Sequence, residues 1–411
     1  SAILLVFSVY IRLKLNESPI FAKMKEEGRG SKAPLTESFL HYPNNKYVLL
    51  ALLGATAGQG VVWYTGQFYA LFFLIGPLKL DFIPAYTLIA ISLVIGTPFF
   101  IFFGWLSDRI GRLKIILAGC LIALLTYFPL FAGLAKTVNP DLVAFQDKTE
   151  LAVSVDPAQC HFNIFVGPWS KFGDCDKAKD FLTKAGLSFK TESAAAGTKA
   201  TLTLNGTKLE GFSAFAWSKA LVDAGYPHLK IATSTVTLDK AQADQLAALQ
   251  AENKTADALK LVSAARLATE GGKKLADTAN IDSVQAAADG SGATVTVSEV
   301  ASVPADPSKV NWFMAELILV IMVLYVTMVY GPIAAFLVEL FPTKIRYTSM
   351  SLPYHIGNGW FGGMLPLLAT AMVAAAGDIY YGLWYPIVVA AMTVVIGTIF
   401  LRETKDVDIT R

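Results

Sequence analysis

A short segment between two apolar stretches holds charged side chains that could form ion pairs at a membrane surface. The segment GWLSDRIGRLK, residues 104–114, contains a carboxylate, two guanidinium groups and two glycines: Asp108, Arg109, Arg112, Gly104 and Gly111. Arginines at such a place anchor the flanking helices at the cytoplasmic side. Anchoring explains neither the aspartate nor the glycines, which allow close approach of the backbone.

A stripe of amide and aromatic side chains could bind a small polar molecule. Gln59, Trp63 and Gln67 recur at i, i+4 and i+8, which puts them on one helix face, and Tyr64 lies beside them. Amide groups are costly against lipid, so this face is expected to line a cavity. The alternative is that these side chains bond neighbouring helices to one another.

Other polar groups lie in the apolar stretches near the carboxyl end. His355 and Asn358 are three residues apart, and His355 is the only histidine within an expected membrane span. Tyr325 and Tyr330 could add hydroxyls to the same cavity, or all four could make structural bonds. For Glu316, placement at the membrane surface is favoured over a proton-binding role.

The cysteines and histidines of the polar middle of the chain give no sign of a metal site. Cys160 and Cys175 are disulfide partners if that part faces an oxidising compartment. Zinc is disfavoured because no second Cys/His pair stands at ligand spacing. His161 and His228 are isolated and are expected at the surface, and Cys120 is expected to be inert packing.

No pattern of an enzyme is evident in the sequence. A Walker A lysine is absent, which disfavours ATP-driven transport, and no Ser/His/Asp or metal-ligand constellation stands out. The net charge of +2 is too small to indicate a nucleic-acid partner, and no nucleic-acid-binding motif is present.

The polar residues above are carried by apolar runs long enough to cross a membrane, which takes about 20 residues per helix. Six runs reach this length: 47–77, 83–106, 114–135, 312–340, 349–376 and 379–401. The chain also opens on the apolar stretch SAILLVFSVYI, with basic residues after it rather than before it. Because a signal peptide has the reverse order, this stretch is expected to be the end of a further membrane helix.

Composition divides the chain into two kinds of segment. Residues 136–308 hold 17 Lys/Arg and 20 Asp/Glu, or 37 of the 66 charged side chains, although the whole chain is 54% hydrophobic with a mean hydropathy of +0.50. The expected fold class is therefore an all-α polytopic membrane protein with an inserted soluble α+β domain.

The distribution of lysine and arginine predicts which ends of the helices face the cytoplasm. These residues gather in four segments that alternate onto one side: 12–46, 109–114, 344–346 and 402–411. The polar block leaves on the opposite side and is therefore expected to be extracytoplasmic. An oxidising environment there makes the proposed disulfide plausible.

The polar block is expected to fold. Residues 199–209 alternate around Asn205–Gly206, a strong hairpin signal. The other expected elements are two short helices, a pair of helices with a break near Asn253, and a further strand: Asp176–Ala185, Ser213–Ala224, 238–276 and 286–300.

Several segments resemble one transporter family. Residues 104–112 fill the pattern G-x-x-x-D-R-x-G-R of cytoplasmic loops in the major facilitator superfamily. VELFPTKIRYTSMSLPYHIGNGWFGGMLP, residues 338–366, resembles the metabolite:proton symporters within it, as do RLKLNESPIFAKM and LRETKDVDI. The resemblance covers residues 1–135 and 310–411, and not the insert.

The resemblance implies a division of the chain in which the six runs are helices seven to twelve and the usual first six helices are absent. The parts are the end of helix six with the central loop, helices seven to nine, the insert, helices ten to twelve and the cytoplasmic tail: 1–46, 47–135, 136–310, 311–401 and 402–411. It also implies that Glu339 and Arg346 pair with Arg109 and Arg112, and that Asp108 lies against the start of helix eleven.

The function implied is proton-coupled symport of a small organic acid or zwitterion by alternating access, in the inner membrane of a bacterium with the insert in the periplasm. Shikimate, 2-oxoglutarate, citrate, proline and betaine are substrates within that family. The expected partners are this substrate, the lipid bilayer and the missing helical half, with no cofactor besides the coupling proton. An alternative of another class is a membrane-anchored sensor or receptor that uses the insert.

Overall fold

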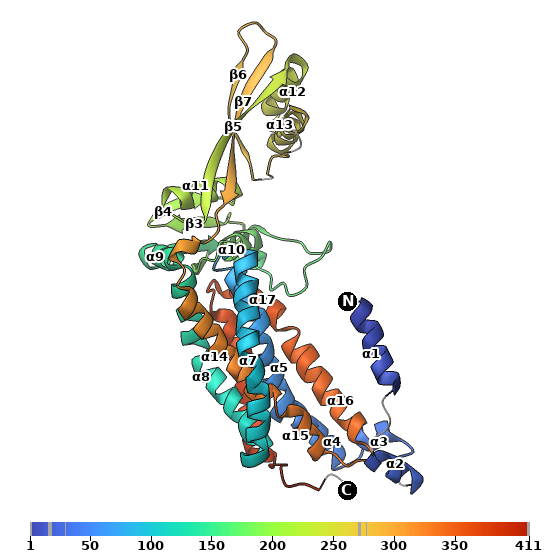
Figure 1. The fold of residues 1–411 in the computed structure, drawn as a ribbon. Helices are drawn as coiled ribbons and strands as arrows, with labels where there is room; N and C mark the ends of the chain where they lie inside the picture. Colours follow the sequence, from blue (N-terminus) through green and yellow to red (C-terminus); the bar gives the residue numbers. More distant parts are fainter. Residues whose placement is uncertain (1, 15–18, 29, 270–272, 277, 409–411) are drawn as a thin grey trace.

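The computed structural model describes residues 2–14, 19–28, 30–269, 273–276 and 278–408, and it places a bundle of long helices beneath a mixed α/β region (Figure 1). Among these residues, six helical segments are long and apolar enough to cross a membrane: Asn44–Ile75, Phe82–Ile110, Arg112–Val138, Trp312–Leu340, Arg346–Ala376 and Tyr381–Phe400. The prediction of six membrane helices is confirmed at this level of length and composition.

The first helical group precedes the α/β region and contains three of the candidate spans. Its first span is interrupted twice by π-helical turns, whereas the next two are continuous despite an internal proline in each. In chain order the segments are α4 (Asn44–Ala51), η1 (Leu52–Thr56), α5 (Ala57–Tyr64), η2 (Thr65–Tyr69), α6 (Ala70–Ile75), α7 (Phe82–Ile110) and α8 (Arg112–Val138).

The second helical group follows the α/β region and packs against the first. α14 lies against α7, α8 and α5, while α18 lies against α8 and α5. Its segments are α14 (Trp312–Tyr330), α15 (Ile333–Leu340), α16 (Arg346–Ile356), η5 (Gly357–Gly362), α17 (Leu365–Ala376), η6 (Tyr381–Leu383) and α18 (Trp384–Phe400).

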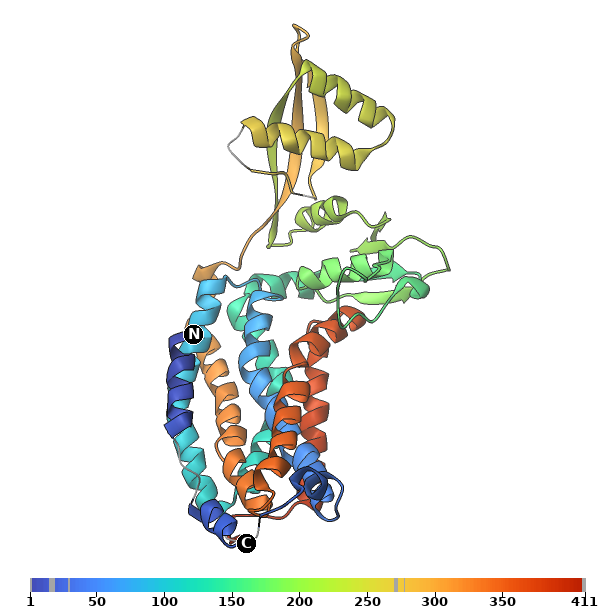
Figure 2. The same ribbon diagram turned by 90° about the vertical axis from the view of Figure 1, so that its right-hand side faces the viewer.

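Shorter helices precede the first span. The second and third lie at the end of the bundle away from the α/β region, whereas the first extends from that end back along the bundle (Figures 1 and 2). They are α1 (Ala2–Lys14), α2 (Pro19–Glu26) and α3 (Pro34–Phe39). Of the segments expected to be cytoplasmic, residues 15–18, 29 and 409–411 lie outside the described residues, as do residues 270–272 of the expected helical stretch 238–276.

The α/β region is built in two layers, and the first lies directly on the helix ends (Figure 2). It holds a four-stranded sheet in the order β2-β1-β3-β4, in which β1 and β2 are parallel and the other pairs antiparallel. Its elements are α9 (Pro140–Lys148), β1 (Leu151–Val155), η3 (Pro157–Gln159), α10 (Asp174–Lys184), β2 (Lys190–Ser193), β3 (Thr201–Leu204), β4 (Thr207–Glu210) and α11 (Ala214–Asp223).

The second layer projects farther from the bundle and is reached by two long strands (Figure 1). Its antiparallel sheet has the order β5-β7-β6, and Val236, Val295 and Val297 pack beneath α12 and α13. Its elements are β5 (Leu229–Asp239), α12 (Lys240–Ala251), α13 (Thr255–Thr269), β6 (Asn280–Ala286) and β7 (Gly292–Ser302), followed by η4 (Pro307–Lys309).

The expected mixed α+β character of the insert is confirmed, with more strands than the sequence patterns indicated. The hairpin β3–β4 turns at Asn205 and Gly206, both with positive φ, and the break between α12 and α13 falls at Asn253. The patterns missed β2, whose sequence KTES is exposed throughout and carries no apolar alternation.

Main-chain hydrogen bonds fasten the α/β region to loops between the candidate membrane spans. The amide of Phe189 donates to the carbonyl of Gly377 at 2.7 Å, and the amide of Ala305 donates to the carbonyl of Lys79 at 2.8 Å. Burial lowers the pKa of Lys79, whose ammonium donates to the carbonyl of Lys184. The α/β region is thus fixed at two of the loops that join the candidate spans.

His228 corrects the expectation that both insert histidines lie at the surface. It is only 3% exposed, and its Nδ1 donates to the carbonyl of Val303 at 3.0 Å. Its Nε2 accepts from the amide of Asn139 at 2.7 Å, and the same amide donates to the carbonyl of Leu78 at 2.9 Å. The ring is buried because it fills the junction between α8, the loop after α6 and the second layer.

Candidate functional site

A pair of reciprocal amide hydrogen bonds joins the first and fifth candidate spans near the middle of the bundle. Gln59 on α5 donates to the amide oxygen of Asn358 on η5, and Asn358 donates back to Gln59, both at 3.1 Å. Asn358 also donates to the carbonyl of Tyr354 at 3.0 Å. Gln59 is fully buried, so its amide is satisfied by the facing helix rather than by water.

Small residues let these two helices approach closely enough for the amides to meet. A Cβ on Gly60 would lie 2.2 Å from the carbonyl oxygen of Gly357, and one on Gly357 would lie 2.7 Å from the backbone of Thr56. The hydroxyl of Thr56 donates to the carbonyl of Pro353 at 2.8 Å. The contact thus depends on glycines that face each other across the two helices.

Both helices change to π-helical geometry around this contact. η1 and η2 flank α5, and η5 holds Asn358 itself. Such turns are rare and occur frequently at functional sites. They rotate the following side chains relative to a continuous α-helix, so the expected spacing of one face is not kept over the whole of Gln59–Gln67.

Aromatic side chains surround the amide pair. Trp63 stacks on Tyr330 of α14 with ring centroids 6.1 Å apart, and it meets Tyr64 edge-on at 4.9 Å. The hydroxyls of Tyr330 and Tyr354 are hydrogen-bonded at 3.1 Å. Side chains from α5, α14 and α16 therefore come together, and all but Tyr354 were expected at the cavity from the sequence.

The remaining expected cavity residues are placed differently. Tyr325 is buried between α14 and α8, where its hydroxyl accepts a hydrogen bond from Thr126 at 3.1 Å. Gln67 is half-buried within η2. His355 is exposed at the end of α16, with its ring edge-on to Tyr354 at 5.7 Å.

A second cluster lies at the opposite end of the bundle from the insert and is centred on Arg112. The Nε and Nη2 atoms of Arg112 donate to one carboxylate oxygen of Glu339, at 3.2 and 3.1 Å, and Nη1 pairs with Asp108. The second oxygen of Glu339 accepts from the hydroxyl of Thr404 at 2.7 Å. The expected pairing of Glu339 with the arginine cluster is thus present in the structure.

The residues after α18 close this cluster, a contact that the sequence patterns did not predict. Glu403 accepts hydrogen bonds from the amides of Arg112, at 2.6 Å, and Leu113, at 3.4 Å, at the start of α8. A carboxylate at this position satisfies free amides and is favoured by the helix dipole. Gly111 has φ +124°, and a Cβ there would lie 2.2 Å from Glu403. The only available signal was an acidic residue just beyond the last apolar run.

The other residues expected to form these ion pairs have different partners. Asp108 pairs with Arg112 one turn away rather than with the start of α16. Arg346 donates to the carbonyl of Phe341 at 3.1 Å. The guanidinium of Arg109 stacks on the ring of Trp105 at 4.1 Å. A Cβ on Gly104 would meet nothing within 4 Å, although its backbone nitrogen would lie 3.4 Å from a Cβ on Gly331 at the end of α14.

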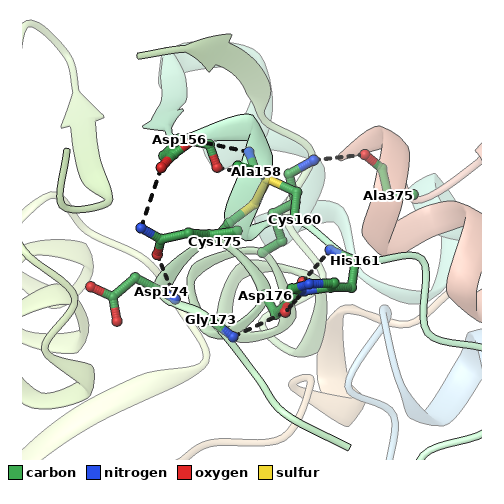
Figure 3. Close-up of a disulfide and its surroundings, with 11 residues drawn as sticks. Asp156, Ala158, Cys160, His161, Gly173, Asp174, Cys175, Asp176 and Ala375 are labelled. Carbon is green, nitrogen blue, oxygen red and sulfur yellow. Dashed lines mark hydrogen bonds and ion pairs between the residues drawn. A yellow bond between two sulfur atoms is a disulfide. The ribbon is translucent and has the colours of Figure 1, made fainter. Parts of the chain in front are cut away.

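The cysteines of the insert form a disulfide between η3 and the start of α10 (Figure 3). The Cα atoms of Cys160 and Cys175 are 5.1 Å apart, and the bond closes a loop between residues 15 apart in sequence. Beside it, Asp176 accepts from the backbone amide and ring of His161 at 2.7 and 2.8 Å. Lys179 donates to the carbonyl of Ala375 at 2.9 Å, which ties this corner to the end of α17.

Comparison with known proteins points to membrane transport. The family model of the Major Facilitator Superfamily matches residues 1–143. A Haemophilus influenzae protein named "Putative metabolite transport protein" is 40% identical over 80 residues, which are 19% of this chain and 17% of that protein. The Escherichia coli K12 protein named "Putative transporter YdfJ" is 26% identical over 113 residues, which are 27% of this chain and 26% of that protein.

These matches are partial. The chain spans between 17% and 26% of the length of the curated relatives just described, and no solved structure matches it. The α/β region from β1 onward and the second helical group lie outside the range of the family match. Residues 1–143 are therefore similar to the Major Facilitator Superfamily, a family of membrane transporters and not of enzymes.

Proposed function

We propose that this chain is the carboxyl-terminal half of a proton-coupled symporter for a small organic acid or zwitterion. The observation that carries the proposal is the meeting of Gln59, Trp63, Tyr330 and Asn358 from α5, α14 and η5. Amide and hydroxyl groups framed by aromatic rings can hydrogen-bond a carboxylate and pack against its carbon skeleton. In this state the two amides satisfy each other, and substrate would replace one of these bonds.

A second helical half is part of this proposal. In α7, and in the span from α16 to α17, only 22% of an 18-residue apolar stretch is buried. The corresponding share is 72% for the span from α4 to α6. Large apolar side chains such as Val94 and Ile101 on α7 and Trp360 on η5 are exposed. These surfaces would meet lipid and the second half, and the substrate would bind between the halves.

The Arg112 cluster would serve as the cytoplasmic latch of the cycle. Glu339, Glu403 and Thr404 join α15, the start of α8 and the tail, so relative movement of these segments must break several charge-assisted hydrogen bonds. A latch of this kind needs only a few kcal/mol to bias two conformations. The basic loops would face the bacterial cytoplasm and the insert the periplasm.

The test is uptake into proteoliposomes by the carrier assembled from this chain and its second half. Shikimate, 2-oxoglutarate, citrate, proline and betaine would each be offered in labelled form under an inward proton gradient. We expect one of them to accumulate, and Gln59→Leu to reduce that accumulation without changing the amount of folded protein. Failure of all five to accumulate would contradict the proposed substrate class.

A matched variant separates a binding role of Gln59 from a merely structural one. Thr126→Val removes the hydrogen bond to Tyr325, which also joins two helices, α8 and α14. We expect this variant to transport with an unchanged KM, whereas Gln59→Leu raises KM. Equal effects of the two substitutions on KM would assign Gln59 to helix packing alone.

A further inference from the structure

Glu316 stands apart from the other carboxylates of the candidate membrane spans. Three acidic side chains lie within these spans: Asp108, Glu316 and Glu339. Asp108 and Glu339 share Arg112 at one end of the bundle. Glu316 lies at the other end, one turn after the start of α14, and both of its carboxylate oxygens are buried with no hydrogen-bond partner among the described residues.

The surroundings of Glu316 offer nothing that would stabilise a negative charge. A groove of about 550 Å³ between α7 and α14 is lined by Glu316 together with Ile83, Pro84, Thr87, Leu88, Ile91, Trp312 and Phe313. Glu316 is the only acidic or basic residue in this lining. The hydroxyl of Thr87 already donates its proton to the carbonyl of Ile83 at 2.9 Å.

Two of the lysines at this end of the bundle are engaged with other partners. Lys309 pairs with Asp141 at 2.6 Å, and Lys79 donates to the carbonyl of Lys184. Lys136 on α8 is exposed and makes no hydrogen bond to Glu316. An ionised carboxylate in an apolar site without a partner is strongly destabilised, whereas the neutral acid is destabilised far less.

The two helices around the groove are packed so that a small movement would change its access to water. A Cβ on Gly96 of α7 would lie 2.3 Å from Val323, which is two turns along α14 from Glu316. At Gly331 the backbone of α14 comes close to Phe100 and Gly104 of α7. The helices therefore touch below the groove, and rocking about these contacts would open or close the groove at its outer end.

We propose that Glu316 binds the coupling proton of the transport cycle, holding it while the groove is closed and releasing it when the groove opens to water. This inference rests on the proposed proton-coupled function. The neutral acid is held in the conformation seen here, and water entering the groove would stabilise the carboxylate and let the proton leave. Proton binding would thus be tied to the arrangement of α7 and α14.

The first experiment examines proton binding and needs no substrate. The 411-residue chain, reconstituted in lipid, is treated with dicyclohexylcarbodiimide, which modifies protonated carboxyl groups in apolar surroundings. We expect modification of Glu316, found by mass spectrometry of the peptide, to fall as pH rises. Glu316→Gln should lose this label, whereas Glu192→Gln, which removes an exposed carboxylate of β2, should keep it. Absence of label at Glu316 at every pH would overturn the proposal.

The second experiment separates this inference from the proposed function. In the assembled carrier, Glu316→Gln mimics the protonated acid, so we expect loss of gradient-driven accumulation with substrate exchange retained, and partial recovery of accumulation in Glu316→Asp. A wild-type carrier without proton-driven accumulation would contradict the proposed function, and the labelling result would still decide whether Glu316 binds a proton. A proton-driven wild type with equal accumulation by Glu316→Gln, or a variant that has lost exchange as well, would overturn the role of Glu316.

Discussion

Arg112 is held by two carboxylates that differ in exposure, and this difference allows the cluster to be dissected. The side chain of Glu339 is 11% exposed, whereas that of Asp108 is 60% exposed. A buried charge that loses its partner retains its full desolvation cost, whereas an exposed pair is screened by solvent. The two carboxylates are therefore expected to contribute unequally to stability although both contact the same guanidinium.

Glu339→Gln is expected to lower the free energy of unfolding by about 1–3 kcal/mol, because it leaves Arg112 partly buried with a weaker acceptor. Asp108→Asn is the matched variant and should cost no more than about 1 kcal/mol. Thermal unfolding in one detergent would compare the two. A larger loss in Asp108→Asn than in Glu339→Gln would contradict this view of the cluster.

The residues that sequence patterns identified well are those whose role follows from type and local spacing. The motif around Arg112 indicated an ion-pair cluster, and Cys160 and Cys175 lie together in the structure. Glu403 was not anticipated because it reaches the start of α8 from nearly three hundred residues away in sequence. The isolation of Glu316 could not be predicted from the sequence, because it depends on which side chains of α7 face it.

At the scale of helices, glycines determine how closely the spans pack. Gly60 and Gly357 face each other, whereas a Cβ on Gly359 of the same π-helical segment would meet nothing within 4 Å. The sequence alone does not distinguish these glycines, because the run GNGWFGG places glycines on several faces of a helix. The structure distinguishes them through the π-helical turns, which decide which residue faces α5.

Gly60→Ala is expected to lower stability by about 1–3 kcal/mol, because its Cβ would collide with the carbonyl of Gly357. Gly359→Ala should be nearly neutral and serves as its control. Melting temperatures in detergent would compare the two variants. If both melted with wild-type protein, the close contact between α5 and η5 would be refuted.

In the insert, the disulfide between Cys160 and Cys175 restricts the chain. Closing a loop of about 15 residues restricts the unfolded chain and is worth about 3 kcal/mol in the loop-entropy model. The double variant Cys160→Ser/Cys175→Ser should therefore lower the stability of the first layer, which fluorescence of the buried Trp217 can follow. Reducing agent should reproduce the effect in the wild type and add nothing in the variant; an unchanged transition in the variant would be evidence against a stabilising disulfide.

At the scale of the whole molecule, His228 makes the attachment of the insert dependent on pH. Burial lowers the pKa of His228, with the Lys79 ammonium adding to this effect, while the carbonyl of Val303 and the charge of Asp141 oppose it. Asn139, from the end of α8, donates to Nε2 of the neutral ring, so a proton on that nitrogen would break the bond. The junction between bundle and insert should therefore hold best when His228 is neutral.

The sign of the pH effect follows from the lowered pKa. The unfolded chain binds a proton on this histidine more readily than the folded one, so its contribution is fully present above about pH 6.5 and is lost as pH falls through the folded value. Wild-type stability should thus fall more steeply on acidification than that of His228→Gln. The exposed His41 provides the control, and a wild-type slope equal to that of the His228 variant would contradict the assignment.

The organisation of the whole chain was predictable from sequence to the extent that composition determines it. Alternating apolar and polar stretches predicted six helical spans and an inserted α+β region, both of which the structure contains within its described residues. The two-layer form of the insert was not predictable, because β5 and β7 pair over their whole length although 53 residues separate Asp239 from Gly292. Non-local pairings of this kind leave no local pattern.

A proton symporter must move protons together with its substrate. The most direct measurement is the external pH of a lightly buffered suspension of proteoliposomes, which contain the assembled carrier, when the accumulated substrate is added without an imposed gradient. We predict alkalinisation of the medium on addition of substrate, abolished by a protonophore and absent in Glu316→Gln. Substrate entry with no change in external pH, in vesicles shown to hold a proton gradient, would contradict proton symport.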